Sequence, residues 1–542
     1  MKLHQGPERV LINRASGDLR VICVSMLPTP PPPPRPNESD GFKATIVLIG
    51  MRGAGKTHLG RATAAALGLP FIDMDHLYEA EHGKIMDTVN TEGWPTFRQR
   101  EVALLRRTLA EDAEGGRGRV VACGGGIVET EAGRELLRAH WPVVQAMKPI
   151  DDVEWYLGID ASRPSLGEPP RVAYARRAGW YDACADFDHM AAPRRFLDHD
   201  AAAAAFVVHV RRACGLAPPT PLPPAPSFAL SLACADVAAA MPLPSALWAN
   251  VDAVEIRADL LSSHAPAAVR LQLAVLRAAC PCPLIFTLRT AAAGGRFGGT
   301  HAEYLALNEM ATRAGVEYLT LDADEIEAEA AEAVVAAEAV VEAADGACLT
   351  TASVAAAARR LGVRVIGLAS LAPARAPTTT RQGAAEMSVV VGAVVERTGL
   401  CRVVVGAAVE RAGLGGYADM RRVEAALTEP THAAHLYAAI ADAADALGCA
   451  HFIALSTGPG ARMSSLLNGL LTPVTHPLLP LPEGEGALDG AEAAAGGEIE
   501  AGVTVKTEAG DFAAMSATSL HSHSHMSATS LLAMRRELGL TQ

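Results

Sequence analysis

The 542-residue chain is poor in aromatic residues and in positive charge. Phe, Trp and Tyr make up only 4% of it, and 60 acidic residues against 47 Lys and Arg give a net charge of −13. An acidic chain offers no extended basic surface, so we expect no nucleic-acid partner. It also lacks any run of eighteen apolar residues, so we expect no membrane-spanning helix and no membrane partner.

Paired cysteines are missing as well. None of the ten cysteines forms a C-x-x-C pair, and Cys280-Pro-Cys282 is too tight for a zinc knuckle. This usage fits a reducing compartment. The N-terminus has no apolar core of the secretory type, so we expect a cytoplasmic protein, with a plastid transit peptide as the open alternative.

The chain is long enough for two to four domains. Proline-rich stretches at 28–36 and 218–226 mark the boundaries of an extended leader and a stiff linker. We divide the chain into a disordered leader (1–42), a first module (43–214), a linker (215–226), a second module (227–480) and a low-complexity tail (481–542).

Apolar runs alternate with helical patterns in both modules, which predicts α/β folds. In the first module the strand candidates are 44–49, 70–74, 119–123 and 141–147, typical of a parallel sheet. In the second they are 228–233, 253–256, 284–288, 318–321, 363–368, 402–405 and 452–455. Such repetition over roughly 250 residues suggests a (β/α)₈ barrel. The irregular stretch 372–399 leaves its closure open.

The strongest motif is Gly50-Met-Arg-Gly-Ala-Gly-Lys-Thr57, the G-x-x-x-x-G-K-[ST] pattern between a predicted strand and helix. Its glycines let backbone N–H groups converge on phosphates at a helix N-terminus. The lysine would reach the β- and γ-phosphates, and the threonine hydroxyl would reach Mg²⁺. The alternative is a glycine-rich turn that binds no phosphate. The predicted ATP-binding residues are Gly50, Gly53, Ala54, Gly55, Lys56 and Thr57.

Further residues narrow the choice of phosphoryl acceptor. Asp73 and Asp75 lie two apart at a strand's carboxyl end, where one can serve Mg²⁺ and the other an acceptor hydroxyl. Arg98 and Glu101 share a helical face, so the glutamate can orient a guanidinium toward a substrate carboxylate. Considered alone, Arg98 and Glu101 fit an ion pair on the protein surface equally well. The remaining candidates are Gly125 and Gly126 after the third strand, Arg163 in a lid-like loop and Arg177.

Together, GMRGAGKT, FIDMD, FRxxE, CGGG, SRP and RRxxWY resemble shikimate kinase over residues 43–214. The resemblance implies that ATP and Mg²⁺ are cofactors and that shikimate is the substrate. Lys56 and Thr57 would contact the phosphates and Mg²⁺, and Asp73 would lie in the second coordination shell of the metal. Arg163 would bind ATP and stabilise the charge on the transferring phosphoryl group. Asp75 would bind hydroxyl groups of shikimate and act as base, and Arg98 and Arg177 would bind its carboxylate. Gly125 and Gly126 would lie against the ring.

The second module resembles type I 3-dehydroquinate dehydratase through DAVEIRAD and FTLRT, which supply Glu255, Arg257 and Arg289. Kinase followed by dehydratase is the domain order of the pentafunctional AROM polypeptides. That family needs a lysine for a Schiff base and a histidine for proton transfer. Here no lysine occurs between Lys148 and Lys506, and no histidine between His301 and His432.

The strand 401–406 looks like the lysine strand with arginine at position 402, and 363–367 is the competing register. Ala293 stands where an acidic or amide residue is expected, and Ser465 where an arginine is expected. Arginine stays protonated and cannot form an imine, so we predict an inactive, vestigial dehydratase site.

The alternatives to a shikimate kinase with an inactive second module are a bifunctional enzyme, a P-loop kinase for another small hydroxylated metabolite, or a non-catalytic scaffold among shikimate-pathway enzymes.

Overall fold

The computed structural model describes 9–13, 20–24, 44–115, 118–159, 168–196, 198–218, 220–223, 225–291, 293–323, 349–370, 409, 412–413, 418–426, 430–449, 451–457, 465, 468, 470–474, 506–507, 510–511 and 528–537. The chain divides into two compact units, Met1–Arg35 and Pro36–Gln542, which are treated separately.

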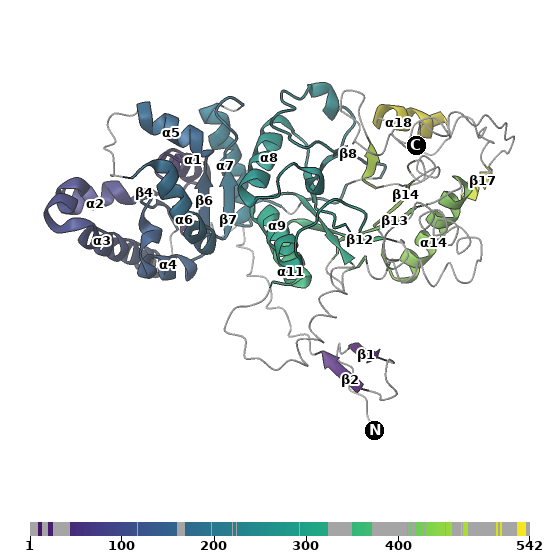
Figure 1. Cartoon of the computed structure of the whole chain (residues 1–542), viewed down its shortest axis with the longest axis horizontal. Coiled ribbons are helices and arrows are strands. Elements are labelled where there is room, and N and C mark those ends of the chain that lie inside the picture. The colour runs from purple at the N-terminus through teal and green to yellow at the C-terminus, as the bar shows by residue number, and fades with distance from the viewer. Residues whose placement is uncertain are drawn as a thin grey trace. The chain divides into compact units, whose positions relative to one another are not determined.

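The first unit contains a small hairpin. Strand β1 (Arg9–Asn13) pairs with β2 (Arg20–Val24) in an antiparallel ladder, visible in Figure 1. The sequence analysis expected a disordered leader at 1–42, and the structure differs for these two strands. Both are rich in valine, isoleucine and leucine, which favour strands, and the neighbouring proline stretch obscured this signal.

The first module of the second unit is built on a five-stranded parallel sheet of order β4-β5-β3-β6-β7. Its central strand β3 sends Ile46 and Leu48 into one core and Val47 and Ile49 into another, as a strand buried on both faces must. The strands are β3 (Ile46–Ile49), β4 (Phe71–Asp73), β5 (Val120–Ala122), β6 (Val143–Met147) and β7 (Phe187–Met190). The predicted parallel α/β sheet is therefore confirmed.

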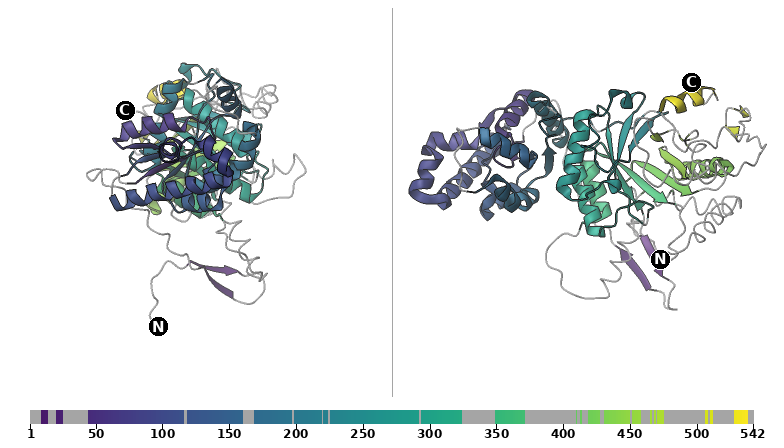
Figure 2. Two further views of the ribbon diagram at one scale, coloured as in Figure 1. Left: turned by 90° about the vertical axis from the view of Figure 1, so that its left-hand side faces the viewer. Right: turned by 45° about the horizontal axis from the view of Figure 1, so that its top comes forward.

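Helices cover both faces of this sheet (Figures 1 and 2). Helices α1 and α7 pack on one face, and α2, α3, α4 and α6 on the other. Helix α3 is broken at Gly93, where φ is 88°, and this break sets the direction of the segment that carries Arg98. The helices are α1 (Lys56–Leu67), α2 (Met74–His82), α3 (Ile85–Gly115), η2 (Ile127–Glu129), α4 (Glu131–Arg138), α5 (Ile150–Ile159), α6 (Pro170–Cys184) and α7 (His199–Ala213).

The second module holds an eight-stranded, all-parallel sheet of order β14-β13-β12-β11-β10-β9-β8-β15, which confirms the barrel-like fold (Figure 2). Among the described residues no ladder joins β14 to β15. Asn468 spans this seam, because its side chain accepts from Ala454 N and donates to Leu470 O and Thr472 Oγ1. The strands are β8 (Phe228–Leu232), β9 (Ala253–Arg257), β10 (Leu284–Thr287), β11 (Tyr318–Asp322), β12 (Arg364–Ser370), β13 (Met420–Ala426), β14 (Phe452–Thr457) and β15 (Thr472–Val474).

Alternate residues of these strands form two layers. In β9, Val254 and Ile256 join the larger core with the helices, whereas Ala253 belongs to a second apolar cluster with residues such as Ile285. The helices are η3 (Ser245–Trp248), η4 (Ala258–Leu260), α8 (Pro266–Ala279), α9 (His301–Arg313), α11 (Thr351–Arg360) and α14 (Pro430–Ala446).

The tail contains more structure than its composition suggested. A short ladder joins β16 (Lys506–Thr507) to β17 (Gly510–Asp511), and α18 (Ala528–Glu537) packs on the second module. Leu531 of α18 is fully buried, and Arg535 donates a 2.8 Å hydrogen bond to Ser465 O. Within the predicted low-complexity tail, 481–542, this helix therefore places one apolar residue in the core of the second module.

Six of the seven strand candidates in the second module and all four in the first coincide with observed strands. The candidate at 402–405 lies outside the described residues. Strands β7, β13 and β15 were missed because they are short or carry charged residues, as in Met-Arg-Arg-Val-Glu of β13.

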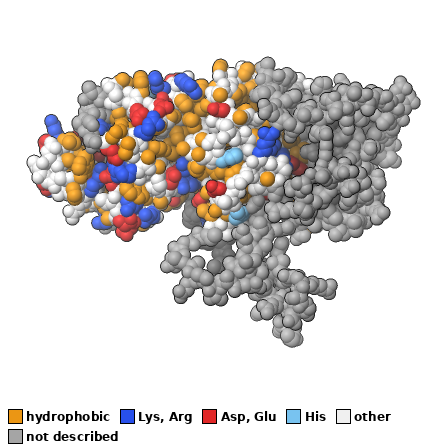
Figure 3. Space-filling model, in the orientation of Figure 1, with side chains coloured by type: hydrophobic (Ala, Val, Ile, Leu, Met, Phe, Trp, Pro, Cys, Tyr) orange, Lys and Arg blue, Asp and Glu red, His pale blue; other side chains and the backbone are white. Residues whose placement is uncertain are grey.

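No helix in the described parts of the chain is long and apolar enough to cross a membrane. On the face shown in Figure 3, basic and acidic side chains are interspersed rather than segregated.

Candidate functional site

The phosphate-binding loop joins β3 to α1. Gly50, Gly53 and Gly55 have φ values of 137°, 85° and 90°, which favour glycine over any other residue. The Lys56 ammonium is buried and donates to Gly50 O at 2.9 Å and Met51 O at 3.0 Å. The predicted loop therefore has the backbone conformation that phosphate binding requires, and the Lys56 ammonium contacts two of its carbonyl oxygens.

Thr57 and Asp73 meet beside this loop. The Thr57 hydroxyl donates a 2.7 Å hydrogen bond to Asp73 Oδ2, and Asp73 Oδ1 accepts from Asp75 N at 3.1 Å as the N-cap of α2. A hydroxyl and a carboxylate are oxygen ligands of the kind that Mg²⁺ prefers. These two residues fit a magnesium ion at the phosphate end of the cavity.

Asp75 lies at the start of α2, is exposed as a residue, and lines the same cavity as Lys56 and Arg98. Burial raises the pKa of its carboxyl group, and the nearby Lys56 charge opposes this effect. A Cβ atom built on Gly124 would lie 2.7 Å from Asp75 Oδ1, so the carboxylate reaches the glycine run after β5. The side chain is thus a partly desolvated carboxylate beside the phosphate loop.

Arg98 and Glu101 form a buried pair rather than a surface one. Arg98 is 9% exposed and Glu101 is 4% exposed, and Arg98 Nη1 donates to Glu101 Oε2 at 2.8 Å. The guanidinium also lies 5.2 Å from the ring centroid of Trp94 and 5.0 Å from that of Phe97. The surface-pair alternative is therefore wrong, because both partners line an internal cavity.

The glycine run packs where side chains would not fit. A Cβ on Gly125 would lie 2.9 Å from Arg52 N of the phosphate loop, and one on Gly126 would overlap the Arg98 guanidinium. The run therefore brings the phosphate loop and Arg98 to opposite sides of one backbone segment. The sequence analysis selected these two glycines to lie against the ring of the acceptor, and that role stays a prediction.

Arg177 reaches the same place from α6. It is 7% exposed, donates from Nε to Glu129 Oε1 at 2.8 Å, and donates from Nη1 to Gly125 O at 3.0 Å. The Tyr181 hydroxyl donates to the same carbonyl, and burial raises the pKa of Tyr181 to about 12. Arg98 and Arg177 are thus brought together as predicted.

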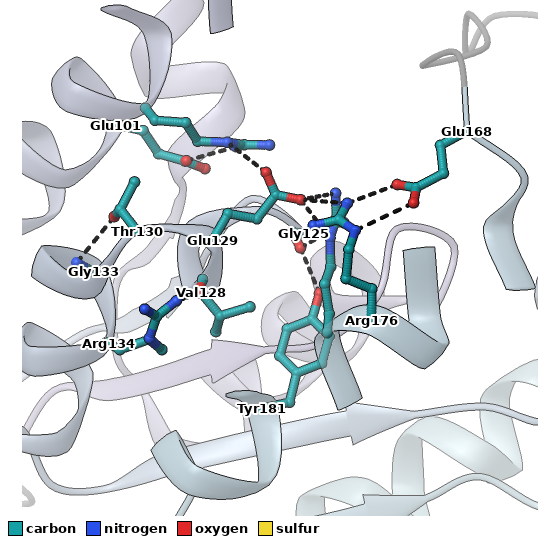
Figure 4. Close-up of polar contacts among 12 residues, drawn as sticks. Glu101, Gly125, Val128, Glu129, Thr130, Gly133, Arg134, Glu168, Arg176 and Tyr181 are labelled. Atoms are coloured by element: carbon teal, nitrogen blue, oxygen red, sulfur yellow. Dashed lines mark hydrogen bonds and ion pairs between the residues drawn. The ribbon is translucent and has the colours of Figure 1, made fainter. Parts of the chain in front are cut away.

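Glu129, at the end of η2, was missed by the sequence analysis. Figure 4 shows its carboxylate in contact with guanidinium groups, among them that of Arg176. The Arg176 guanidinium also forms an ion pair with Glu168. Burial would raise the pKa of Glu129, but Arg177 and Arg98 outweigh it and the pKa is lowered. An acidic residue three positions after the triple glycine was the only available signal.

These side chains line a cavity of about 640 Å³ that extends from the phosphate loop to Arg98 and Arg177. A second cavity of about 690 Å³ shares Arg98 and Arg177 with it. Lys148, also missed, contributes a further cation to the wall of the first cavity. Arg163 lies outside the described residues. The arrangement can hold a polyphosphate at one end and a carboxylate at the other.

The second module has a charged centre. Arg422 of β13 donates to Glu255 Oε1 at 2.8 Å and to Glu424 Oε1 at 2.7 Å, and all three side chains are buried. Thr287 donates to Glu255 at 2.8 Å, and Arg289 lies 2.7 Å from Glu424 Oε2. The network therefore joins β9 and β10 to β13, which is separated from them in the sheet by β11 and β12.

Arg257 and Asp259 make a separate bidentate pair with two 2.9 Å hydrogen bonds. Burial would raise the pKa of Glu424, but Arg289 and Arg422 lower it to about 2. Glu255, Glu424 and Asp259 are therefore each paired with at least one arginine.

Comparison with known proteins identifies both modules. Residues 52–212 match the family model "Shikimate kinase", and residues 228–341 match "Type I 3-dehydroquinase". The chain carries a shikimate kinase domain followed by a type I 3-dehydroquinase domain. Both families fit the shikimate pathway of aromatic amino-acid biosynthesis.

A curated protein that is similar to this chain is a multifunctional polypeptide. The chain is 33% identical over 293 residues to a pentafunctional AROM polypeptide of Clavispora lusitaniae, a match that covers 52% of this chain and 18% of that polypeptide. The chain thus spans under a fifth of the length of this relative.

Solved structures were matched as well. One is a shikimate kinase from Acinetobacter baumannii in complex with shikimate (27% identity, TM-score 0.29, covering 32% of this chain and 94% of that one). Another is a type I 3-dehydroquinate dehydratase from Clostridium difficile (15% identity, TM-score 0.34, covering 48% and 91%).

One assignment in the dehydroquinase domain stays a prediction. The sequence analysis placed the arginine-substituted lysine strand at 401–406, with 363–367 as the alternative register. Residues 401–406 lie outside the described residues, whereas 364–370 form strand β12, and the next described strand is β13 with Arg422.

Proposed function

We propose that this chain transfers the γ-phosphoryl group of ATP to the 3-hydroxyl of shikimate. The observation that carries the proposal is the convergence of Arg98 and Arg177 beside the glycine run, at the far end of the cavity from Lys56 and Thr57. Two guanidinium groups suit a carboxylate on a small acceptor. The match of residues 52–212 to the shikimate kinase family supports the same substrate.

The roles of the residues follow from their positions. Lys56 would leave the carbonyls that it contacts and neutralise phosphate charge, and Thr57 and Asp73 would hold Mg²⁺. The ion would supply charge stabilisation on the transferring phosphoryl group. Asp75, partly desolvated, would orient the acceptor hydroxyl and accept its proton. Arg163 is assigned to the transferring charge by family resemblance alone.

Two substitutions test the proposal. Lys56→Ala and Arg98→Ala should abolish shikimate-dependent ADP release. Arg100→Ala is the matched control for the second, because Arg100 lies two residues away on α3, forms its ion pair with exposed Glu92 and otherwise interacts with Tyr78. Full activity in both variants would refute the assignment. Gluconate in place of shikimate separates a kinase for another hydroxylated metabolite, since only a carboxylated ring should require Arg98 and Arg177 together.

We further propose that the dehydroquinase domain does not dehydrate its family's substrate. No lysine lies between Lys148 and Lys506, and in the part of the barrel that the structure describes Arg422 is the cation that joins the buried Glu255 and Glu424. A guanidinium stays protonated and forms no Schiff base. Borohydride reduction with dehydroquinate should therefore trap no covalent adduct. An adduct would instead favour a bifunctional enzyme. If neither activity is found, the chain acts as a scaffold among pathway enzymes.

A further inference from the structure

The two arginines of the acceptor site share one internal carboxylate. Glu129 Oε1 accepts from Arg177 Nε at 2.8 Å, and its Oε2 lies 3.5 Å from Arg98 Nε. Both guanidinium groups are therefore approached on their Nε edges. In Figure 4 the Glu129 carboxylate occupies the centre of this set of contacts.

The opposite edges of the guanidinium groups are held differently. Arg98 Nη1 donates to Glu101, and Arg177 Nη1 donates to Gly125 O. Each Nη carries two hydrogens, so one contact leaves the second available. Arg98 Nη2 lies against Gly126, at the turn after β5. Glu129 thus supports Arg177 through Nε and Nη2 and lies in ion-pair range of Arg98 Nε, while a hydrogen on the Nη1 of each arginine remains for a ligand.

Two neighbouring guanidinium groups repel one another unless a negative charge lies between them. Glu129 supplies this charge, since its lowered pKa keeps it ionised at neutral pH. Glu101 supports only Arg98 through a hydrogen bond, and Gly125 O offers Arg177 a neutral acceptor. Among the described residues, Glu129 is the one acid that contacts both arginines.

We propose that Glu129 is a positioning residue that holds Arg98 and Arg177 side by side, so that both present N–H groups to the carboxylate of the acceptor. This role rests on the proposed kinase function. Glu129 touches the arginines and not the reacting atoms, so it should govern acceptor binding and leave the phosphoryl-transfer step unchanged.

The test is steady-state ADP release by the full chain with shikimate varied at saturating ATP. Glu129→Gln keeps the size of the side chain and removes its charge. Loss of a charge-assisted hydrogen bond should raise the KM for shikimate by about 10- to 100-fold. The kcat should stay within about threefold and the KM for ATP within about twofold, because Lys56 and Thr57 are not perturbed.

The chain provides a matched control. Glu168→Gln removes a carboxylate that pairs with Arg176 on the other side of the same cluster without contacting Arg98 or Arg177. Its KM for shikimate should remain within about twofold of wild type. Glu129→Asp, which keeps the charge but withdraws it, is the second variant and should raise KM in the same direction.

The outcomes are distinct. An unchanged KM in both Glu129 variants overturns the inference, and so does a fall in kcat at unchanged KM, which would place Glu129 in the chemical step. An equal rise in KM for Glu168→Gln also overturns it. A wild-type chain that releases no ADP with shikimate defeats the proposed function, and the inference with it.

Discussion

Replacing Arg422 by methionine should strongly destabilise the dehydroquinase domain. The substitution leaves Glu255 and Glu424, which are 2% and 6% exposed, without the cation that bonds to both. Breaking a buried ion pair costs about 3–5 kcal/mol. For a domain of this size each kcal/mol corresponds to about 2–4 °C, so the melting temperature should fall by about 6–20 °C.

The pH dependence gives this prediction a sign. In the wild type the pKa of Glu424 is lowered from 4.5 to about 2, so its contribution is present above pH 4.5 and is lost as the pH falls toward 2. That contribution amounts to about 3 kcal/mol. Because Arg289 lowers this pKa as well as Arg422, acid removes from the wild type an interaction of which the substitution removes the Arg422 part at pH 7. The stability gap between the two proteins should narrow as the pH falls below 4.5.

Urea unfolding followed by hydrogen exchange of peptides from β13 and β14 measures this gap domain by domain. Arg421→Met is the control, because Arg421 bonds to a backbone carbonyl, Val409 O, and to no carboxylate of the described residues. It should cost less than about 1 kcal/mol. Equal stability of Arg422→Met and wild type at pH 7, or a gap that is constant down to pH 3, would refute the reasoning.

Three further outcomes are expected in the kinase domain. Arg98→Ala should lower kcat/KM for shikimate at least about 100-fold, whereas Arg100→Ala should change it less than about twofold in the same assay. Gly126→Ala should abolish shikimate binding measured by calorimetry, because its Cβ would overlap the Arg98 guanidinium, whereas Gly179→Ala meets no atom within 4 Å and should be tolerated. Asp75→Asn should lower kcat by about 10²–10⁴ and yet raise the melting temperature, since burial raises the pKa of Asp75 and its charge therefore destabilises the fold at neutral pH. Wild-type turnover in that variant would exclude Asp75 as the base.

Much of the kinase site could be predicted from sequence because its residues lie in short segments that follow parallel strands. The carboxyl ends of such strands meet at one edge of the sheet. The phosphate loop after β3, Asp73 and Asp75 after β4, and the glycines after β5 were therefore expected to converge, and the structure brings them together. Arg98 and Arg177 lie on helices, and their approach to the same cavity depended on the family resemblance.

The parts that escaped prediction depend on long-range pairing. Glu129 gains its role from arginines 31 and 48 residues away in the sequence, a relation that no local pattern reveals. Arg422 was missed because a strand with two arginines and a glutamate looks exposed, although its charges are neutralised by Glu255 on another strand. Helix α18 was hidden by repetitive composition, since burial of Leu531 requires the rest of the second module.

The central claim is that the kinase domain phosphorylates shikimate in the cavity lined by Lys56 and that the dehydroquinase domain does not dehydrate 3-dehydroquinate. A coupled ADP-release assay with shikimate, run beside an assay for dehydration of 3-dehydroquinate on the same preparation, tests it most directly. The account predicts shikimate-dependent ADP release that Lys56→Ala and Arg98→Ala eliminate, and no dehydration. Dehydration without shikimate-dependent ADP release would contradict it.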